Sequence, residues 1–235
     1  MPKTGAVIVA AGRSSRMGGV DKVFASLAGR PLLCHALGVF EAAPEVETIV
    51  LVTAADRMDD ARRAVAPFRF VKLASICAGG ERRQDSVRVG LEQLGHVDVV
   101  VIHDAVRPMV TAEMIRVGLI EVAETGAAIA AIPAVDTLKE ADSDGNVIRT
   151  IPRERLWAVQ TPQVFDYELL LEAHLKWRED VTDDAMLIEA LGRRIKLFLG
   201  SPRNIKVTTP DDLVIAEALL APGDSTLRAA GRDDR

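Results

Sequence analysis

The sequence lacks the features that define several common classes of protein. It contains two cysteines, Cys34 and Cys77, with no Cys-x-x-Cys pair and no spacing typical of a metal site. Both lie beside apolar residues, so we expect reduced, buried thiols in a cytoplasmic protein rather than a disulfide framework. No run of eighteen apolar residues occurs, and the N-terminus has no long apolar segment. The chain therefore predicts neither a membrane span nor a secretion signal.

Aromatic residues are scarce, and the chain has no excess of positive charge. Aromatics make up 4% of the chain, and the formal net charge at pH 7 is −5. We expect no nucleic-acid partner, because such a partner favours a basic chain. The remaining composition is ordinary for a globular protein, with 49% hydrophobic and 27% charged residues among 235. That length is sufficient for one large α/β domain with an ample core.

An apolar segment at residues 6–11 leads into a loop at residues 12–22. The segment has no alternating polar residues, which predicts a strand buried on both faces, as in a parallel sheet. The loop carries Arg13, Arg16 and Lys22, and exposed amides with cations at the end of a buried strand suit a polyphosphate. It matches neither the Walker A loop nor the dinucleotide fingerprint. From this stretch alone, an ordinary loop with solvated charges remains the alternative.

Strand-like and helix-like segments alternate along most of the chain. This alternation predicts an α/β fold with a doubly wound, mostly parallel sheet, which binds ligands at the carboxyl ends of its strands. The expected strands are 6–11, 47–53, 70–73, 97–102, 127–132 and 194–199, and the expected helices are 31–43, 56–66, 84–94, 111–124, 167–179, 183–191 and 210–220.

Residues 133–155 break the alternation. Two short segments flank the turn sequence 142–146, which predicts a protruding β-hairpin arm. The arm has too few apolar residues to stand alone, so it must lie on its own domain or on another subunit. We expect residues 1–221 to form a single domain that includes the arm, and residues 222–235 to form a flexible tail.

Three further clusters are candidates for ligand binding. The pair Gly79-Gly80 allows close approach of the backbone to a flat ring, and Ser86 is near enough to reach a sugar hydroxyl. Asp104 follows a core strand, where a carboxylate can bind Mg²⁺ or a ribose hydroxyl. Lys206 adds a cation before the last helix. The alternatives are a tight turn for the glycines, a structural pair of Asp104 with Arg107, and a solvated lysine.

The histidines do not indicate a catalytic group. His103 has no visible cysteine or acid partner for nucleophilic or zinc chemistry, so we interpret it as structural. His35, His96 and His174 are predicted to lie on the surface.

Taken together and in order, these motifs are specific. The segments 10–18, 79–87, 103–108, 156–165, 182–185 and 204–213 closely resemble those of the 2-C-methyl-D-erythritol 4-phosphate cytidylyltransferases of the non-mevalonate isoprenoid pathway. The resemblance covers roughly residues 5 to 220. Two departures concern the first loop: Ser14 stands where the family usually has a second glycine, and Asp21-Lys22-Val23 replaces Pro-Lys-Gln. These could change how the loop closes over a triphosphate.

The resemblance implies a Rossmann-like nucleotidyltransferase that joins CTP to methylerythritol phosphate. A phosphate oxygen of the substrate would attack the α-phosphorus of CTP in line and expel pyrophosphate, with no covalent nucleophile. Arg16 and Lys22 would stabilise the developing charge, and Mg²⁺ or another divalent cation would bridge the triphosphate, with Asp104 as a candidate ligand. The implied CTP site comprises Ala10, Ala11, Gly12, Gly80, Glu81, Ser86, Asp104 and Ala105.

The resemblance also implies a homodimer with interlocked arms. The substrate would contact Asp104, Arg107, Thr161 and Lys206, and Thr137 and Arg153 from the partner's arm. Arg153 and Lys206 would join Arg16 and Lys22 as the catalytic set.

Two other functions remain open at this point. One is a ribitol 5-phosphate cytidylyltransferase, although relatives of that type typically depart from the motifs at 83–87 and 182–185, which are intact here. The other is a non-catalytic nucleotide-binding protein, which would not need Arg16, Lys22, Arg153 and Lys206 together.

Overall fold

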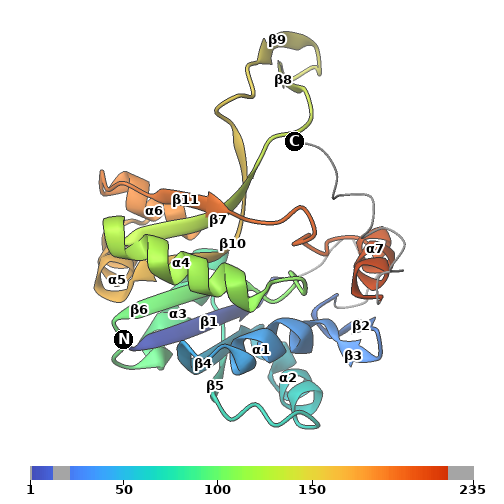
Figure 1. The fold of residues 1–235 in the computed structure, drawn as a ribbon, viewed down its shortest axis with the longest axis vertical. Helices are drawn as coiled ribbons and strands as arrows, with labels where there is room; N and C mark the ends of the chain where they lie inside the picture. The colour runs from blue at the N-terminus through green and yellow to red at the C-terminus, as the bar shows by residue number, and fades with distance from the viewer. Residues whose placement is uncertain (1, 13–21, 222–235) are drawn as a thin grey trace, which may run out of the picture.

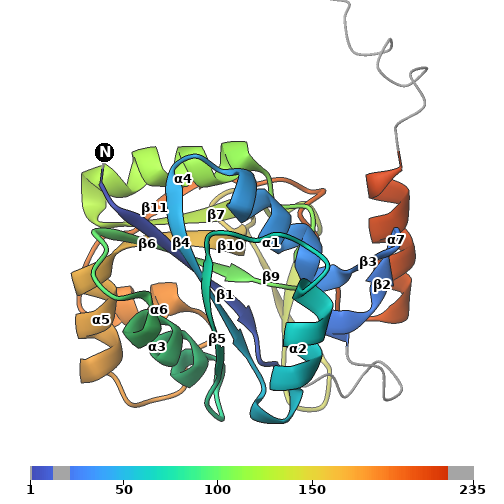
Figure 2. The ribbon, with the colours of Figure 1, turned by 90° about the horizontal axis from the view of Figure 1, so that it is seen from below.

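The computed structural model describes residues 2–12 and 22–221, and its centre is a seven-stranded sheet. The strands lie in the order β11-β7-β10-β6-β1-β4-β5 (Figures 1 and 2). Within the described residues β10 alone runs against its neighbours, and the other pairings in this sheet are parallel. The bounds are β1 (Thr4–Ala10), β4 (Val46–Thr53), β5 (Leu73–Ala78), β6 (Val99–Asp104), β7 (Ala127–Pro133), β10 (Trp157–Asp166) and β11 (Lys196–Leu199).

Helices cover both faces of this sheet (Figure 2). Along β1, Ala6 and Ile8 belong to one buried cluster, and Val7 and Val9 belong to the other. Because successive side chains of a strand point to opposite faces, one apolar run supplies both cores. The first face packs against α1 (Leu32–Ala42), α2 (Met58–Val65) and α4 (Ala112–Thr125), and the second against α3 (Arg83–Leu94), α5 (Tyr167–Lys176) and α6 (Asp184–Ala190). The predicted doubly wound α/β fold is confirmed.

The remaining elements lie at the edge of this core. The last helix, α7 (Pro210–Leu220), has the predicted bounds, and Thr209 and Asp212 form a capping box at its start. It packs near a small hairpin of β2 (Ser26–Leu27) and β3 (Arg30–Pro31). The described residues also include two short 3-10 helices, η1 (Lys22–Phe24) and η2 (Ala55–Arg57). None of the helices in the described ranges has the length and apolar character needed to cross a bilayer.

The predicted strand at 70–73 is wrong, because the chain turns there and β5 begins only at Leu73. Two aromatic residues at this turn pack on each other and on the core. The rings of Phe68 and Phe70 stack with their centroids 5.7 Å apart, and both lie against the first cluster. The turn itself is only partly buried, with Val71 85% exposed.

Strand β10 was not predicted at all, although it lies between β6 and β7 in the sheet. Its sequence contains Pro162, which removes a backbone donor and argues against a central strand. The structure accommodates the proline at a shift of register with β7 between Val159 and Gln163. The ladder is interrupted at the proline and resumes after it.

The hairpin arm is confirmed as β8 (Leu138–Ala141) and β9 (Val147–Ile151), and it stands clear of the body (Figure 1). The Asp142 carboxylate closes its turn by accepting hydrogen bonds from the N–H groups of Asp144 and Asn146. Apolar side chains on the arm are left open, with Val135 75% and Val147 61% exposed. The tail at 222–235 lies outside the described residues, and the division into one domain and a tail stays a prediction.

Close packing of α3 on the sheet makes Gly90 a test of this fold. A Cβ on Gly90 would overlap Cγ1 of Val7 and lie 3.0 Å from Cγ2 of Val52, both in the central strands. We expect Gly90→Ala to lower the free energy of unfolding by about 1–3 kcal/mol through overpacking. In α1, no described atom lies within 4 Å of a Cβ placed on Gly38. Gly38→Ala should therefore raise stability by up to about 1 kcal/mol, since alanine favours a helix. Urea unfolding of the two variants would contradict this packing if it gave equal stabilities.

Candidate functional site

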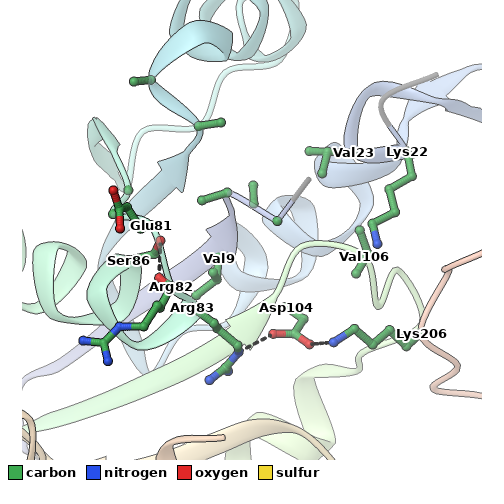
Figure 3. Close-up of a pocket in the computed structure, with 17 residues that line it drawn as sticks. Val9, Lys22, Val23, Glu81, Arg82, Arg83, Ser86, Asp104, Val106 and Lys206 are labelled. Atoms are coloured by element: carbon green, nitrogen blue, oxygen red, sulfur yellow. Dashed lines mark hydrogen bonds and ion pairs between the residues drawn. The ribbon is translucent and has the colours of Figure 1, made fainter. Parts of the chain in front are cut away.

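A pocket of about 630 Å³ lies at the carboxyl ends of β1 and β6 (Figure 3). The chain runs outward from β1 to β4 and β5 and then returns to β6 on the other side of β1. Neighbouring strands whose connections leave in opposite directions create a crevice at this end of the sheet. Ala10 and Asp104 end the two strands and both line the pocket.

Small residues form one wall of the pocket. Ala10 ends β1 and is followed by Ala11 and Gly12, and Gly79 and Gly80 follow β5. A Cβ on Gly79 would lie 2.8 Å from Cβ of Ala11, so a larger residue would close the space between the two segments. Backbone groups are therefore accessible to a flat ligand on this wall. Of the residues predicted to bind a nucleotide, the structure brings these to the pocket: Ala10, Ala11, Gly12, Gly80, Glu81, Ser86 and Asp104.

The floor of the pocket carries Asp104 between two cations (Figure 3). Lys206 Nζ lies 2.8 Å from Oδ2 of Asp104, and Arg83 Nε lies 3.4 Å from Oδ1. Burial raises the pKa of the Asp104 carboxyl, but the Arg83 and Lys206 charges outweigh it and hold the pKa well below its usual range. Asp104 is therefore ionised at neutral pH, and the floor presents a fixed pattern of charge.

Lys206 reaches the pocket from a loop that is anchored on both sides. The N–H of Val207 donates to the carbonyl of Val106 at 2.8 Å. Asn204 is fully buried, and its Nδ2 donates to the Thr161 carbonyl at 2.8 Å and to Oε1 of Gln160 at 3.2 Å. These bonds hold the loop before α7 against β6 and β10, so the lysine is positioned by the fold.

Arg83 is a residue of the site that was not predicted from the sequence. It lines the pocket at the start of α3, and its Nη1 lies 2.6 Å from Oδ2 of Asp184 in the motif at 182–185. A signal was present, because cations are unfavourable at a helix N-terminus unless something else holds them. Neighbouring Arg82 is likewise held, by Asp85 at 2.8 Å and Asp180 at 2.8 Å.

The prediction that His174 lies on the surface is wrong. Its side chain is 3% exposed, and Nε2 lies 3.3 Å from Oδ1 of Asp184. Instead, α5 turns this side chain toward Asp184 at the start of α6. A buried carboxylate attracts donors from several directions, and His174 is one of them.

His103 is structural, as predicted, and it forms a hydrogen-bonded chain with Thr161. Thr161 Oγ1 accepts the N–H of Asp104 at 3.1 Å and lies 3.0 Å from Nδ1 of His103. We infer that the threonine donates its proton to Nδ1, while Nε2–H of His103 donates to the Arg107 carbonyl at 3.2 Å. The imidazole is neutral in this arrangement, and burial lowers its pKa to about 4.

This histidine makes stability depend on pH. Below pH of about 6.5 the unfolded chain protonates His103, whereas the folded chain resists until about pH 4. The unfolded state then binds more protons, so stability falls as pH falls through this window. When the pH is lowered from 7 to 5, we expect the free energy of unfolding to fall by about 2 kcal/mol more in the unaltered protein than in His103→Gln, because the glutamine amide does not titrate. Urea unfolding at both pH values measures this, and parallel losses in the two proteins would contradict it.

Several predicted contact residues do not lie at the pocket. Ala105 is buried and donates its N–H to the Val9 carbonyl at 2.9 Å, and Arg107 Nη1 donates to the Asn204 carbonyl at 2.8 Å. Thr161 is 4% exposed, and its Oγ1 lies 3.0 Å from Nδ1 of His103. None of these three residues lines the pocket, and their predicted contacts with a ligand stay predictions. Thr137 and Arg153 are exposed on or beside the arm, away from the pocket.

The predicted triphosphate loop is only partly described. Lys22 lines the pocket opposite Asp104 (Figure 3), whereas Arg16, Ser14 and Asp21 lie outside the described residues.

The metal prediction has a limited basis in this chain. Among residues 2–12 and 22–221, no group of three or more His, Cys, Asp or Glu side chains could hold an ion. Asp104 offers one carboxylate, with both oxygens facing cations. Mg²⁺ commonly binds through one or two carboxylates together with substrate phosphates. The donor set therefore fits an ion that arrives with a triphosphate better than an ion resident in the protein.

Comparison with known proteins places these features in a family. The model of the family described as IspD, 2-C-methyl-D-erythritol 4-phosphate cytidylyltransferase, matches residues 4–222. A protein of that name from Dehalococcoides mccartyi (strain ATCC BAA-2266 / KCTC 15142 / 195) is 47% identical over 221 residues, which cover 94% of this chain and 97% of the relative. Another from Pelotomaculum thermopropionicum is 44% identical over 237 residues, covering 98% and 100%.

A solved structure agrees with these sequence relatives. The chain is similar to the crystal structure of 4-diphosphocytidyl-2C-methyl-D-erythritol synthase from Anaerococcus prevotii DSM 20548, with a TM-score of 0.81 and 29% sequence identity. The similarity covers 93% of this chain and 96% of the other. The two chains thus share one overall fold.

Proposed function

The chain belongs to the 2-C-methyl-D-erythritol 4-phosphate cytidylyltransferase family, and we propose that the pocket at the ends of β1 and β6 is its active site. The protein is a nucleotidyltransferase that transfers CMP from CTP to 2-C-methyl-D-erythritol 4-phosphate in isoprenoid biosynthesis. The observation that carries the placement is the charged floor, where Asp104 lies between Lys206 and Arg83 beneath a wall of small residues.

In this proposal the cytidine lies against the Gly79-Gly80 wall. Exposed backbone groups there can form hydrogen bonds with the edge of a pyrimidine, and Ser86 lines the same wall. The triphosphate then extends toward Lys22 on the opposite side of the pocket. This orientation brings the α-phosphorus near the floor, where Lys206 is positioned for the phosphate of the second substrate.

The reaction needs alignment and charge stabilisation rather than a covalent nucleophile. A phosphate oxygen of methylerythritol phosphate attacks the α-phosphorus in line, and pyrophosphate leaves. Negative charge builds on the phosphoryl oxygens, and we propose that Lys22 and Arg16 stabilise it. Lys206 holds the attacking phosphate in place, which raises the probability of productive alignment.

Two residues near the floor of the pocket, His103 and Arg107, act indirectly. His103 accepts a hydrogen bond from Thr161 behind the floor. Arg107 holds the loop that carries Lys206 through the Asn204 carbonyl.

We propose Mg²⁺, or another divalent cation, as the cofactor. It would neutralise the triphosphate and be held mainly by phosphate oxygens, with Asp104 as one protein ligand.

A homodimer is the proposed assembly, with the arm of each subunit reaching its partner. Support comes from the arm's position clear of its own body and from its open apolar side chains, including Val135, Val147 and Ile148. Thr137 and Arg153 would then complete the partner's substrate site. We also propose a cytoplasmic location, for which the two unpaired cysteines are compatible with a reducing compartment.

A turnover assay that follows pyrophosphate release tests this function and its specificity. We expect turnover with CTP, Mg²⁺ and 2-C-methyl-D-erythritol 4-phosphate, and at least about tenfold lower kcat/KM with ribitol 5-phosphate. ATP and GTP should be poor substrates. Gly79, Ala11 and Ser86 pack closely together at this wall, and this leaves little room for a purine. Omitting the second substrate gives the background rate. Comparable turnover with a purine nucleotide would contradict the proposed base site.

A further inference from the structure

Four alternating charges connect the interior beside α6 to the pocket. Asp184 Oδ2 lies 2.6 Å from Arg83 Nη1, Arg83 Nε lies 3.4 Å from Asp104 Oδ1, and Asp104 Oδ2 lies 2.8 Å from Lys206 Nζ. Figure 3 shows the last three side chains in line across the floor. The fourth member, Asp184, does not line the pocket.

Burial makes Asp184 an unusual place for a carboxylate. Its side chain is 0% exposed, so ionisation is tolerated only because nearby donors replace water. Arg83 provides one contact, and Nε2 of His174 provides another at 3.3 Å. Neither Asp184 Oδ1 nor His174 Nε2 has a hydrogen-bond partner among the described residues, so their 3.3 Å approach is a close polar contact and not a well-aligned hydrogen bond. Asp184 does not line the pocket, and Arg83 is the residue that contacts both Asp184 and the pocket residue Asp104.

We propose that Asp184 is a positioning residue, which holds the Arg83 guanidinium so that Asp104 keeps its orientation toward Lys206 and the pocket. His174 supports Asp184 from the far side. The inference rests on the proposed function, because it assumes that the pocket binds CTP and methylerythritol phosphate.

The physical reason is competition for the guanidinium. Arg83 now divides its donors between two carboxylates, presenting Nη1 to Asp184 and Nε to Asp104. Without the Asp184 charge, the Arg83 guanidinium can turn and form two parallel hydrogen bonds with the Asp104 carboxylate, the geometry that arginine and carboxylate prefer. Asp104 would then be drawn from Lys206, and both substrates would meet a displaced floor.

The primary test compares Asp184→Asn with Asp183→Asn. Asp183 controls for the loss of a charge one residue away: asparagine keeps the oxygen that caps α6 through Met186 N–H, and it gives up only the oxygen that accepts from Nε2 of Gln163 at 2.8 Å. We expect Asp184→Asn to lower kcat/KM for CTP by about tenfold, and Asp183→Asn to change it by less than about twofold. Urea unfolding of each variant sets the folded fraction used in the comparison. Equal kcat/KM in the two variants would overturn the proposal.

A double-mutant cycle with Arg83→Met separates positioning from general destabilisation. If Asp184 acts through Arg83, Asp184→Asn should cause no further loss of kcat/KM in the Arg83→Met background. Removing both partners also avoids leaving one buried charge unpaired, so the double variant should fold at least as well as Asp184→Asn. Losses that multiply across the cycle would overturn the proposal.

Variants of His174 provide a second test of the proposal if Asp184→Asn does not fold. His174→Gln keeps a donor near the position of Nε2, whereas His174→Leu removes it. We expect His174→Leu to lower kcat/KM by about threefold and His174→Gln to restore most of it; equal activities would count against the proposal.

If the unaltered protein bound CTP without turning it over, the proposed function would fail. The same comparisons, made on the CTP dissociation constant, would then still decide the role of Asp184.

Discussion

Lys22→Met is expected to reduce kcat by about 10²-fold or more, with a much smaller effect on CTP binding. Lys22 lines the pocket across from Asp104, on the side where the triphosphate is proposed to lie. Methionine has a similar length and no charge, so the change removes a cation and leaves the shape of the wall. Because charge on the phosphoryl oxygens grows toward the transition state, its loss raises the barrier more than it weakens the ground state.

Lys176→Met is a suitable control. Lys176 lies on α5, is paired with Glu172 and is 62% exposed, so its loss should leave kcat unchanged. Steady-state kinetics with both substrates varied gives kcat and both Michaelis constants. A kcat within about threefold of the unaltered protein, with a raised Michaelis constant for CTP, would make Lys22 a binding residue instead. Arg16→Ala is expected to behave as Lys22→Met does, since the resemblance assigns both the same task.

Mixing two inactive variants should restore activity if the arm completes its neighbour's site. The proposed homodimer combines Arg16 and Lys22 of one subunit with Arg153 of the other. Arg16→Ala and Arg153→Ala homodimers should each be nearly inactive. In a mixed dimer, one site carries both defects and the other carries neither. Unfolding and refolding an equimolar mixture should make about half of the dimers mixed, so about a quarter of all sites should recover full activity.

Two controls accompany this experiment. Combining the folded variants without subunit exchange should restore nothing. Arg155→Ala, an exposed arginine two residues along the same segment, should remain active as a homodimer. Refolded material that stays inactive, although size measurements confirm mixed dimers, would mean that each arm serves its own subunit.

Much of the fold was predictable from local pattern alone. Buried strands such as Thr4–Ala10 and Val99–Asp104 are short apolar runs, and helix starts such as Thr111 and Thr209 have side chains that cap the first turn. These signals operate over a few residues, where the chain's own geometry decides the outcome. The ordered motifs were equally sufficient for the family, because their residues and order are specific without any knowledge of contacts.

Part of the pocket was also predictable from neighbouring residues. The walls at 10–12 and 79–80 follow strands directly, and parallel strands of one sheet end at the same edge. Residue type and position along a strand thus indicated which segments would meet. By contrast, Ala105, Arg107 and Thr161 sit in the right motifs but turn their polar groups into the protein. Motif membership alone does not distinguish a ligand contact from the support beneath it.

Tertiary structure decided the features that join distant segments. The pairing of Arg83 with Asp184 spans 101 residues, and the insertion of β10 between β6 and β7 depends on strand order. Arg83 at the start of α3 gave a local signal that it needs a partner, but nothing local identified Asp184, and Pro162 reads as the end of a strand. Burial accounts for both features. A charge that is removed from water needs a group of opposite charge beside it, and a strand that lies between two others tolerates one interruption of its hydrogen-bond ladder. The sequence alone thus determined the family and the strand ends that form the pocket, and the folded chain determined which charges face one another across its floor.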